Sequence, residues 1–176
     1  MKKLNYGFDI DGTLCTIDSA LQAFNKITKN SILIDGMYDY HFAKVYDLSP
    51  QDEVAIWKEQ TKNIILASEP NISVVNYLKR LREQGNGITI VTARGVEYTE
   101  ETAFWLKKYG IQYDSLHMNQ TDKFKVLHNE EVVRFLDDKG ELIESLMSTP
   151  LAETCELTIV DAPYNRKFKS HSRFYV

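Results

Sequence analysis

Two acidic residues lie two positions apart at the end of the first apolar run of the chain. Asp9 and Asp11 belong to a segment that begins at Tyr6 and predicts a short buried strand, and Gly12 predicts a turn directly after it. In an extended chain, side chains two residues apart point the same way and lie about 7 Å apart. Two such carboxylates repel each other unless a cation binds between them or one keeps its proton, and oxygen ligands favour Mg²⁺. A plain solvated turn also fits these residues when they are taken alone.

Polar residues also end three later apolar runs, each typical of a buried strand. They are Thr92, the pair Asp137 and Asp138, and Asp161. Because ligands of an open parallel sheet bind outside the carboxyl ends of its strands, these residues are expected to converge on one site. Each of them alone fits a helix cap or a turn equally well.

Two lysines, Lys123 and Lys125, precede the acidic pair. Each one alone fits a solvated surface cation. Taken together, a metal, a carboxylate nucleophile, a hydroxyl donor and an ammonium group are the parts needed to hold a phosphoryl group and transfer it to a carboxylate. The whole set therefore favours phosphoryl-transfer chemistry over any of the single interpretations.

The elements that must position these residues alternate along the chain from residue 70 onward. Short apolar runs predict strands, and segments with a helical period lie between them. Strands separated by helices imply right-handed crossovers and a parallel sheet, so we expect an α/β fold with three layers, αβα and Rossmann-like. The predicted strands are 6–10, 88–92, 132–136 and 157–160, with a weaker extended stretch at 113–118, and the predicted helices are 72–84, 98–109, 122–128 and 141–147.

The segment after the first strand contains no predicted strand. A helical period follows the turn, and a second helix is predicted from Ser49, a good N-cap, with Pro50 in the first helical position. We therefore expect a core domain made of residues 1–14 and 69–176, with a small helical cap of residues 15–68 inserted between them.

The composition limits the class of protein. The chain has 176 residues, 43% of them hydrophobic and 26% charged, which fits one globular domain, or one domain with an insertion, and excludes a disordered chain. A net charge of −4 argues against duplex nucleic acid as a partner. No apolar run approaches the roughly 20 residues of a membrane helix. Cys15 and Cys155 match no metal-ligand spacing, so we expect reduced thiols and a cytoplasmic protein, and the sequence predicts no oligomeric state.

The polar residues lie in motifs that resemble those of the haloacid dehalogenase (HAD) superfamily of phosphohydrolases. Residues 9–14 (DIDGTL) resemble the first motif, residues 90–94 (IVTAR) the second, and residues 135–138 (FLDD) the fourth, with Lys123 at a family-like distance before the acids. The resemblance extends from residue 5 to about 165. Residues 15–68 match only the family's habit of placing a small helical cap at this point.

The resemblance implies a role for each acidic residue. Asp9 would attack phosphorus and become an aspartyl phosphate, and Asp11 would protonate the leaving oxygen and then activate a water molecule. Mg²⁺ would be held by the Asp9 carboxylate, the backbone carbonyl of Asp11 and an acid of the fourth motif. We prefer Asp138 as the direct ligand, with Asp137 behind it. A charge count around bound phosphate requires Asp11 to be protonated at the first step.

The other motif residues are implied to bind the phosphoryl group. Thr92 and Lys123 would grip its oxygens, and Lys125 is the rival for the lysine role, although the spacing to the acidic pair favours Lys123. Ala93 and Arg94 follow Thr92 and are further candidates for substrate binding. The sequence leaves open whether Arg94 contacts the phosphate or points into solvent.

The closing motif indicates a substrate. Residues 160–165 (VDAPYN) and the early helical cap are similar to the cytosolic 5′(3′)-deoxyribonucleotidases and their bacterial relatives, which implies a nucleoside monophosphate. Tyr40 and Phe42 of the insertion are candidates for stacking on a base, a contact worth about 1–3 kcal/mol, although packing in the core is the commoner role of such residues. Two alternatives remain: a phosphatase of the same mechanism for another small phosphomonoester, such as a sugar phosphate, and a non-enzymatic phospho-acceptor module. The motif order argues against the second.

Overall fold

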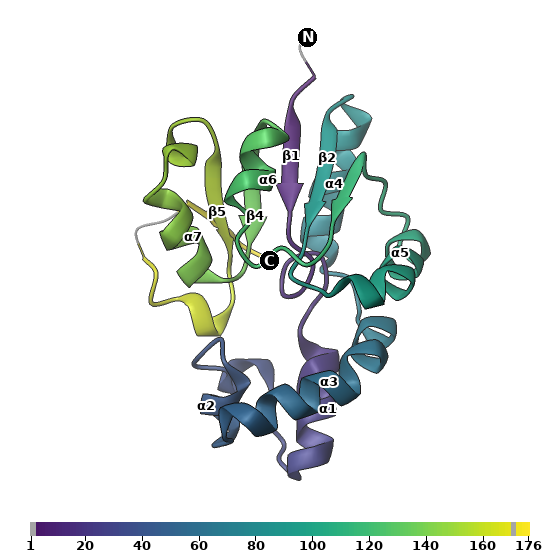
Figure 1. The fold of residues 1–176 in the computed structure, drawn as a ribbon, viewed down its shortest axis with the longest axis vertical. Helices are drawn as coiled ribbons and strands as arrows, with labels where there is room; N and C mark the ends of the chain where they lie inside the picture. The colour runs from purple at the N-terminus through teal and green to yellow at the C-terminus, as the bar shows by residue number, and fades with distance from the viewer. Residues whose placement is uncertain (1–2, 170–171) are drawn as a thin grey trace.

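A parallel sheet forms the centre of the molecule. The computed structural model describes residues 3–169 and 172–176. In this part of the chain, six strands form one sheet in the order β3-β2-β1-β4-β5-β6, and every neighbouring pair is parallel (Figure 1). This arrangement confirms the predicted α/β class and its parallel sheet. The strands are β1 (Asn5–Phe8), β2 (Gly87–Val91), β3 (Ser115–His117), β4 (Val132–Asp137), β5 (Glu156–Val160) and β6 (Ser172–Phe174).

Helices cover both faces of this sheet and make the outer two of three layers. Phe135 and Leu136 of β4 belong to different buried clusters, because successive side chains of a strand point to opposite faces. On one face Trp105 of α5 packs in the cluster with Leu136, and on the other Leu127 of α6 packs with Phe135. The covering helices are α4 (Ile72–Glu83), α5 (Thr99–Lys108), α6 (Phe124–Asn129) and α7 (Gly140–Met147). Within the described residues, every helix is too short or too polar to cross a lipid bilayer.

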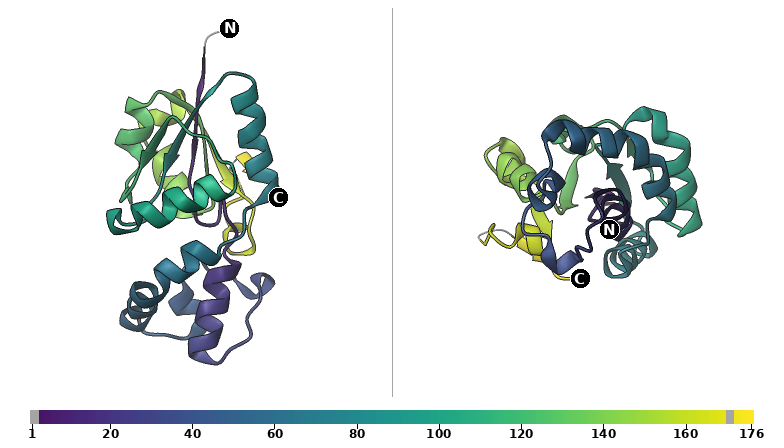
Figure 2. Two further views of the ribbon diagram at one scale, coloured as in Figure 1. Left: turned by 90° about the vertical axis from the view of Figure 1, so that its right-hand side faces the viewer. Right: turned by 90° about the horizontal axis from the view of Figure 1, so that it is seen from below.

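The α-helices that lie within residues 15–68 gather beyond the carboxyl ends of the strands (Figures 1 and 2). Ser49 caps the longest helix by accepting a hydrogen bond from the Asp52 N–H group, as its position predicts. Aromatic side chains of this segment belong to a buried cluster that also includes Tyr164 of the core, and in it Phe24 and Phe42 lie with ring centroids 4.5 Å apart. The helices of the insertion are α1 (Asp18–Thr28), α2 (Phe42–Tyr46) and α3 (Pro50–Ala67).

The insertion leaves and rejoins the core at adjacent points. The N–H group of Thr16 donates a hydrogen bond to the carbonyl of Glu69 (3.0 Å), and the N–H group of Asn71 donates to the carbonyl of Leu14 (2.8 Å). These bonds hold the outgoing and the returning segments side by side, directly below the carboxyl edge of the sheet.

Candidate active site

Three carboxylates meet at the carboxyl edge of the two central strands. The register pairs Phe8 of β1 with Leu136 of β4, so the next residues, Asp9 and Asp137, leave neighbouring strands at the same level. Carboxylate oxygens of Asp9, Asp137 and Asp138 all lie within 4.8 Å of one another, and all three residues are buried. The structure thus brings together three of the four acids that the motifs singled out. We call these three residues the acidic cluster.

Lys123 joins two members of the acidic cluster. Its Nζ atom lies 2.5 Å from Asp9 Oδ1 and 2.7 Å from Asp137 Oδ2, and its side chain is only 4% exposed. Lys123 immediately precedes α6, which packs against β4 and so carries the residue to the edge of the sheet. Lys125 is exposed. Of the two rival lysines, the structure therefore places Lys123 in the cluster.

Burial changes the ionisation of Asp9 and Asp138. Burial raises the pKa of Asp9 to about 7, against the lowering effect of Lys123 and with a further rise from the Asp137 carboxylate. Burial and the neighbouring Asp137 also raise the pKa of Asp138 well above its ordinary value. A raised carboxyl pKa means that the surrounding protein does not fully compensate negative charge at this place.

The charge and the free oxygens of the acidic cluster fit a divalent cation. Three carboxylates face one ammonium group, so two negative charges are left over when all three acids are ionised. Asp9 Oδ2 and Asp138 Oδ1 accept no hydrogen bond from the described residues. Oxygen donors with this charge are the set that Mg²⁺ prefers in proteins. The residues present therefore fit Mg²⁺.

Asp138 is held in place by residues of the closing motif. The hydroxyl group of Tyr164 donates a hydrogen bond to Asp138 Oδ2 (2.6 Å), and the Asn165 side chain donates to the Asp138 carbonyl (2.8 Å). Gly12 lies against the same carboxylate: its φ is +76°, and a Cβ atom there would lie 2.3 Å from Asp138 Oδ2. Asp138 Oδ2 is therefore fixed by Tyr164, while Oδ1 has no hydrogen-bond donor among the residues that the structure describes.

Asp137 differs from its neighbour because both of its oxygens are engaged. Oδ1 accepts a hydrogen bond from the Lys139 N–H group (2.8 Å), and Oδ2 accepts one from Lys123 (2.7 Å). Asp161, the last of the strand-end acids, is bound by Arg166 (3.1 Å) and Arg173 (2.9 Å) and does not belong to the acidic cluster.

Asp11 lies outside the acidic cluster and pairs with Arg94. Nε and Nη2 of Arg94 donate hydrogen bonds to Asp11 Oδ2 (2.8 Å) and Oδ1 (2.7 Å), and the Cys15 thiol lies 3.6 Å from Oδ1. Although burial opposes it, the Arg94 guanidinium lowers the pKa of Asp11 below its ordinary value. The charge count asks for a protonated Asp11 at the first step, whereas the structure holds this residue as a carboxylate. Arg94 is 6% exposed, so it faces Asp11 and not solvent.

Thr92 directly follows β2 at the same edge of the sheet. The register pairs Ile90 of β2 with Phe8, which places Thr92 beside the turn that follows β1. Thr92 is buried, and its Oγ1 accepts a hydrogen bond from the Arg94 N–H group (3.2 Å). Ala93, between them, is exposed. This short turn carries the Arg94 side chain back towards Asp11.

An aromatic cavity of about 150 Å³ lies between the helical insertion and the core. Tyr40 and Phe42, the candidates for base stacking, therefore reach the edge where the motif acids lie. Tyr40 also contacts the core directly, because the Lys139 ammonium lies 4.8 Å from the centre of its ring. The cavity is lined by Asp11, Asp138 and Tyr164 from the core and by Tyr40, Phe42, Glu53 and Trp57 from the insertion.

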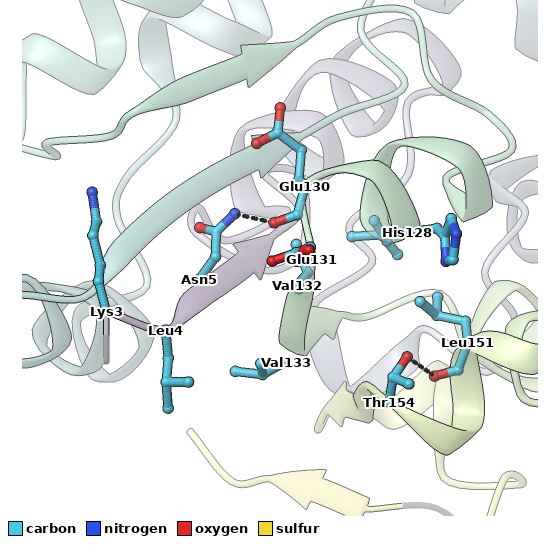
Figure 3. A pocket seen from close by; sticks show the side chains of 11 residues that line it. Lys3, Leu4, Asn5, His128, Glu130, Glu131, Val132, Val133, Leu151 and Thr154 are labelled. Atoms are coloured by element: carbon cyan, nitrogen blue, oxygen red, sulfur yellow. Dashed lines mark hydrogen bonds between the residues drawn. The ribbon is translucent and has the colours of Figure 1, made fainter. Parts of the chain in front are cut away.

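A larger cavity, of about 450 Å³, lies at the opposite end of the sheet (Figure 3). Asn5 and Val132 at the starts of β1 and β4 line it together with His128 and Glu130, and the Asn5 side chain donates a hydrogen bond to the Glu130 carbonyl (2.8 Å). This cavity is larger than the aromatic cavity, but its size alone does not make it the active site. Ligands of open parallel sheets bind at the carboxyl ends of the strands, where the acidic cluster lies.

The sequence does not indicate two features of this site. Glu53 reads as an ordinary acid in the first turn of a helix, yet its Oε1 accepts a hydrogen bond from the Phe42 N–H group (3.1 Å) and its side chain lines the aromatic cavity. The pairing of Asp11 with Arg94 joins residues 83 positions apart. The sequence motifs identify Asp11 and Arg94, but they carry no information about where the two side chains point.

Curated proteins with similar sequences are named nucleotidases. No family model matches the chain. Nucleotidase CA_C3379 of Clostridium acetobutylicum is 27% identical over 178 residues, which cover 99% of this chain and 90% of that protein. A protein of Oceanobacillus iheyensis named "Putative nucleotidase OB0422" is 24% identical over 179 residues, covering 97% of this chain and 93% of its own.

Solved structures with the same fold are HAD-type enzymes. A predicted phosphoglycolate phosphatase from Haemophilus somnus superposes with a TM-score of 0.65 at 18% identity, covering 98% of this chain and 93% of that one. The haloacid dehalogenase-like hydrolase SP0104 from Streptococcus pneumoniae gives 0.64 at 15% identity, covering 98% and 94%. The fold is therefore that of the HAD phosphohydrolases, and the resemblance and the enzyme class predicted from the motifs are confirmed. The curated proteins that are similar to this chain in sequence are named nucleotidases.

Proposed function

We propose that this protein is an Mg²⁺-dependent phosphomonoester hydrolase that forms an aspartyl phosphate on Asp9 and prefers nucleoside monophosphates. The observation that carries the proposal is the environment of Asp9. Its Oδ1 is fixed by Lys123, its Oδ2 accepts no hydrogen bond within the described part of the chain, and two further carboxylates lie within 4.8 Å. A buried carboxylate with a free oxygen beside an ammonium group and a cation site is arranged to attack phosphorus.

The proposed reaction has two steps. In the first, Asp9 Oδ2 bonds to phosphorus, the bond from phosphorus to the leaving oxygen breaks, and the leaving oxygen takes a proton from Asp11. In the second, Asp11 takes a proton from water, the water oxygen bonds to phosphorus, and the bond from Asp9 to phosphorus breaks. Asp11 is protonated when the first step begins and again when the second step ends, and it returns this proton to the departing phosphate, so that the sum is hydrolysis of the ester. Because Arg94 holds Asp11 as a carboxylate in the free protein, Asp11 must take up a proton before the first step, and the phosphate monoanion, with a second pKa near 6, can bring it.

Asp9 and Asp138 are the carboxylates that would hold Mg²⁺, together with the backbone carbonyl of Asp11. Both oxygens of Asp137 already accept hydrogen bonds, from Lys123 and from the Lys139 N–H group. Asp137 would therefore not contact the ion directly but would hold Lys123 in position. When bound, the ion would neutralise the negative charge that gathers as phosphate meets the acidic cluster. Thr92 and Lys123 would then bind the phosphoryl oxygens.

The aromatic cavity supports a nucleoside as the leaving group. It adjoins Asp11, the proposed proton donor, and it offers the rings of Tyr40, Phe42 and Trp57. Stacking of a base on such a ring contributes about 1–3 kcal/mol in proteins that bind single strands. A sugar phosphate has no flat ring to use this surface, so the cavity favours nucleoside monophosphates among small phosphomonoesters.

The test is phosphate release by the purified protein across a panel of nucleoside monophosphates and sugar phosphates. We expect turnover that needs Mg²⁺ and is abolished by EDTA, with a clear preference for the nucleotides. Asp9→Asn removes the nucleophile and is expected to abolish turnover, whereas Asp114→Asn, at the opposite end of the sheet, is the matched control and is expected to retain it. Normal rates from Asp9→Asn would refute the mechanism. Equal rates on sugar phosphates would refute the substrate class, and a phosphorylated protein that persists for hours without releasing phosphate would point to an acceptor module.

A further inference from the structure

Arg94 reaches from the turn after β2 to the turn after β1. Its side chain is 3% exposed, and its Nε and Nη2 atoms bind the two oxygens of Asp11 at 2.8 and 2.7 Å. A planar guanidinium that binds both oxygens of a carboxylate fixes the plane of that carboxylate as well as its position. Asp11 therefore has one orientation where an unpaired side chain of its length would have several.

Arg94 is itself anchored on its far side. Its Nη1 atom donates a hydrogen bond to Oγ1 of Thr102 in α5 (3.3 Å), and its backbone N–H group donates to Thr92 Oγ1 (3.2 Å). Thr102 is fully buried. The guanidinium is thus tied to α5, and the Arg94 backbone is tied to Thr92, so that the side chain is held at both ends by the core.

The other side of Asp11 is open. Its side chain is 50% exposed and lines the aromatic cavity. One face of the carboxylate is therefore bound by Arg94, and the opposite face is turned to the space where the leaving group of the proposed reaction would lie. Each of the three guanidinium nitrogens of Arg94 donates to a protein atom, and the partners are Asp11, Thr102 and Cys15.

We propose that Arg94 is a positioning residue that fixes the Asp11 carboxyl group for proton transfer to and from the reacting oxygens. The inference rests on the proposed function and gives Arg94 a role that differs from contact with the phosphate. A displacement of about 1 Å in a reacting group can lower a rate about 100-fold, which sets the scale of the expected effect.

The experiment compares two leaving groups. The values of kcat/KM for Arg94→Gln and Arg94→Lys are measured with a nucleoside monophosphate and with p-nitrophenyl phosphate. A nucleoside leaves as a poor alkoxide and needs the proton, whereas nitrophenolate leaves without one. We expect kcat/KM to fall about 100-fold for the nucleotide and less than about 10-fold for p-nitrophenyl phosphate, with Arg94→Lys only partly restored because lysine cannot bind both oxygens.

Two further variants separate positioning from folding. Thr102→Val removes the hydrogen bond that anchors Arg94 to α5 but keeps the pairing of Arg94 with Asp11. We expect a smaller loss of kcat/KM with the same dependence on the leaving group. This variant tests the inference even if the Arg94 variants fold poorly. Arg82→Gln is the matched control, because it breaks another arginine–aspartate pair (Arg82 and Asp114, 2.6 Å) at the opposite end of the sheet. We expect it to change neither substrate's kcat/KM.

The final measurement asks whether the effects of the Asp11 and Arg94 substitutions on kcat/KM add together. If Arg94 acts through Asp11, the double variant Asp11→Asn/Arg94→Gln is no slower than Asp11→Asn alone. An equal loss of kcat/KM for both leaving groups, or a double variant much slower than Asp11→Asn, would overturn the inference and leave the proposed function standing. A wild-type protein that hydrolyses neither substrate would instead refute the proposed function itself.

Discussion

Lys123 illustrates how much one buried side chain contributes at the residue scale. Its ammonium group is bonded to both Asp9 and Asp137, so its removal leaves two buried carboxylates without their partner. Breaking a buried ion pair from one side costs about 3–5 kcal/mol. The same substitution also removes the cation that would bind the phosphoryl oxygens.

We therefore expect Lys123→Met to lower the free energy of unfolding by about 3 kcal/mol in Mg²⁺-free buffer and to abolish phosphatase activity. Lys125→Met is the matched control, because Lys125 is exposed and its loss is expected to change stability by less than about 0.5 kcal/mol. Urea unfolding and phosphate release measure the two effects. Indistinguishable results for the two variants would contradict the placement of Lys123 in the site.

At this scale, the sequence predicted which acidic residues converge better than it predicted how their side chains point. Strand-end acids could be recognised because strands end at identifiable residues, and the structure brings Asp9, Asp137 and Asp138 together. The choice between Lys123 and Lys125 depends on where α6 begins, which sequence patterns locate only to within a few residues. The orientation of Asp11 could not be predicted, since it is set by Arg94 in a different turn.

Among the elements, the turn after β1 is the one most tightly tied to the site. Gly12 has a φ of +76°, and a Cβ atom there would strike Asp138 Oδ2 at 2.3 Å, whereas Gly85 has a φ of +83° with nothing within 4 Å. Alanine at either position has the same backbone strain of about 1–2 kcal/mol. Only alanine at position 12 also displaces the carboxylate that would hold the ion.

Gly12→Ala and Gly85→Ala are therefore expected to lose similar amounts of stability but to differ in metal dependence. We expect the Mg²⁺ concentration for half-maximal activity to rise about 10- to 100-fold in Gly12→Ala, the usual cost of disturbing a ligand's support, and to stay unchanged in Gly85→Ala. Titration of activity with Mg²⁺ is the measurement. A normal titration curve for Gly12→Ala would show that Asp138 does not hold the ion.

Elements with a clear period were predictable, and short ones were not. The helix after Ser49 was expected from its cap and from Pro50, and the structure begins α3 at that residue. The five-residue helix α2 lies in the irregular aromatic stretch after Met37, where no period is long enough to detect. Its conformation is set by contacts of Phe42 with Phe24 and Trp57 from neighbouring helices.

At the scale of the whole molecule, the helical insertion restricts access to the site. The aromatic cavity of about 150 Å³ is smaller than the roughly 300–1,000 Å³ of pockets that hold drug-sized ligands. We therefore expect that a nucleotide, the proposed substrate, enters only when the insertion moves away from the core. Lys62 of α3 and Glu101 of α5 form an ion pair of 2.5 Å between the two parts and mark a place where this movement can be blocked.

Cross-linking provides the test. The native thiols, Cys15 and Cys155, are buried, so a Lys62→Cys/Glu101→Cys variant can be joined selectively by a reducible bis-methanethiosulfonate linker. We expect linked protein to lose most of its nucleotidase activity and to regain it on reduction, while Lys62→Cys alone is unaffected by the reagent. Full activity in the linked form would show that the site is reached without movement of α3 against α5.

The paired connectors at residues 14–16 and 69–71 have a consequence for how such molecules change over time. Since both ends of the insertion meet at one hydrogen-bonded step, the whole segment can be lengthened, shortened or exchanged without rerouting any strand. Under the proposed function, the core residues that would cleave the ester and the insertion residues that would contact its alcohol can then diversify independently.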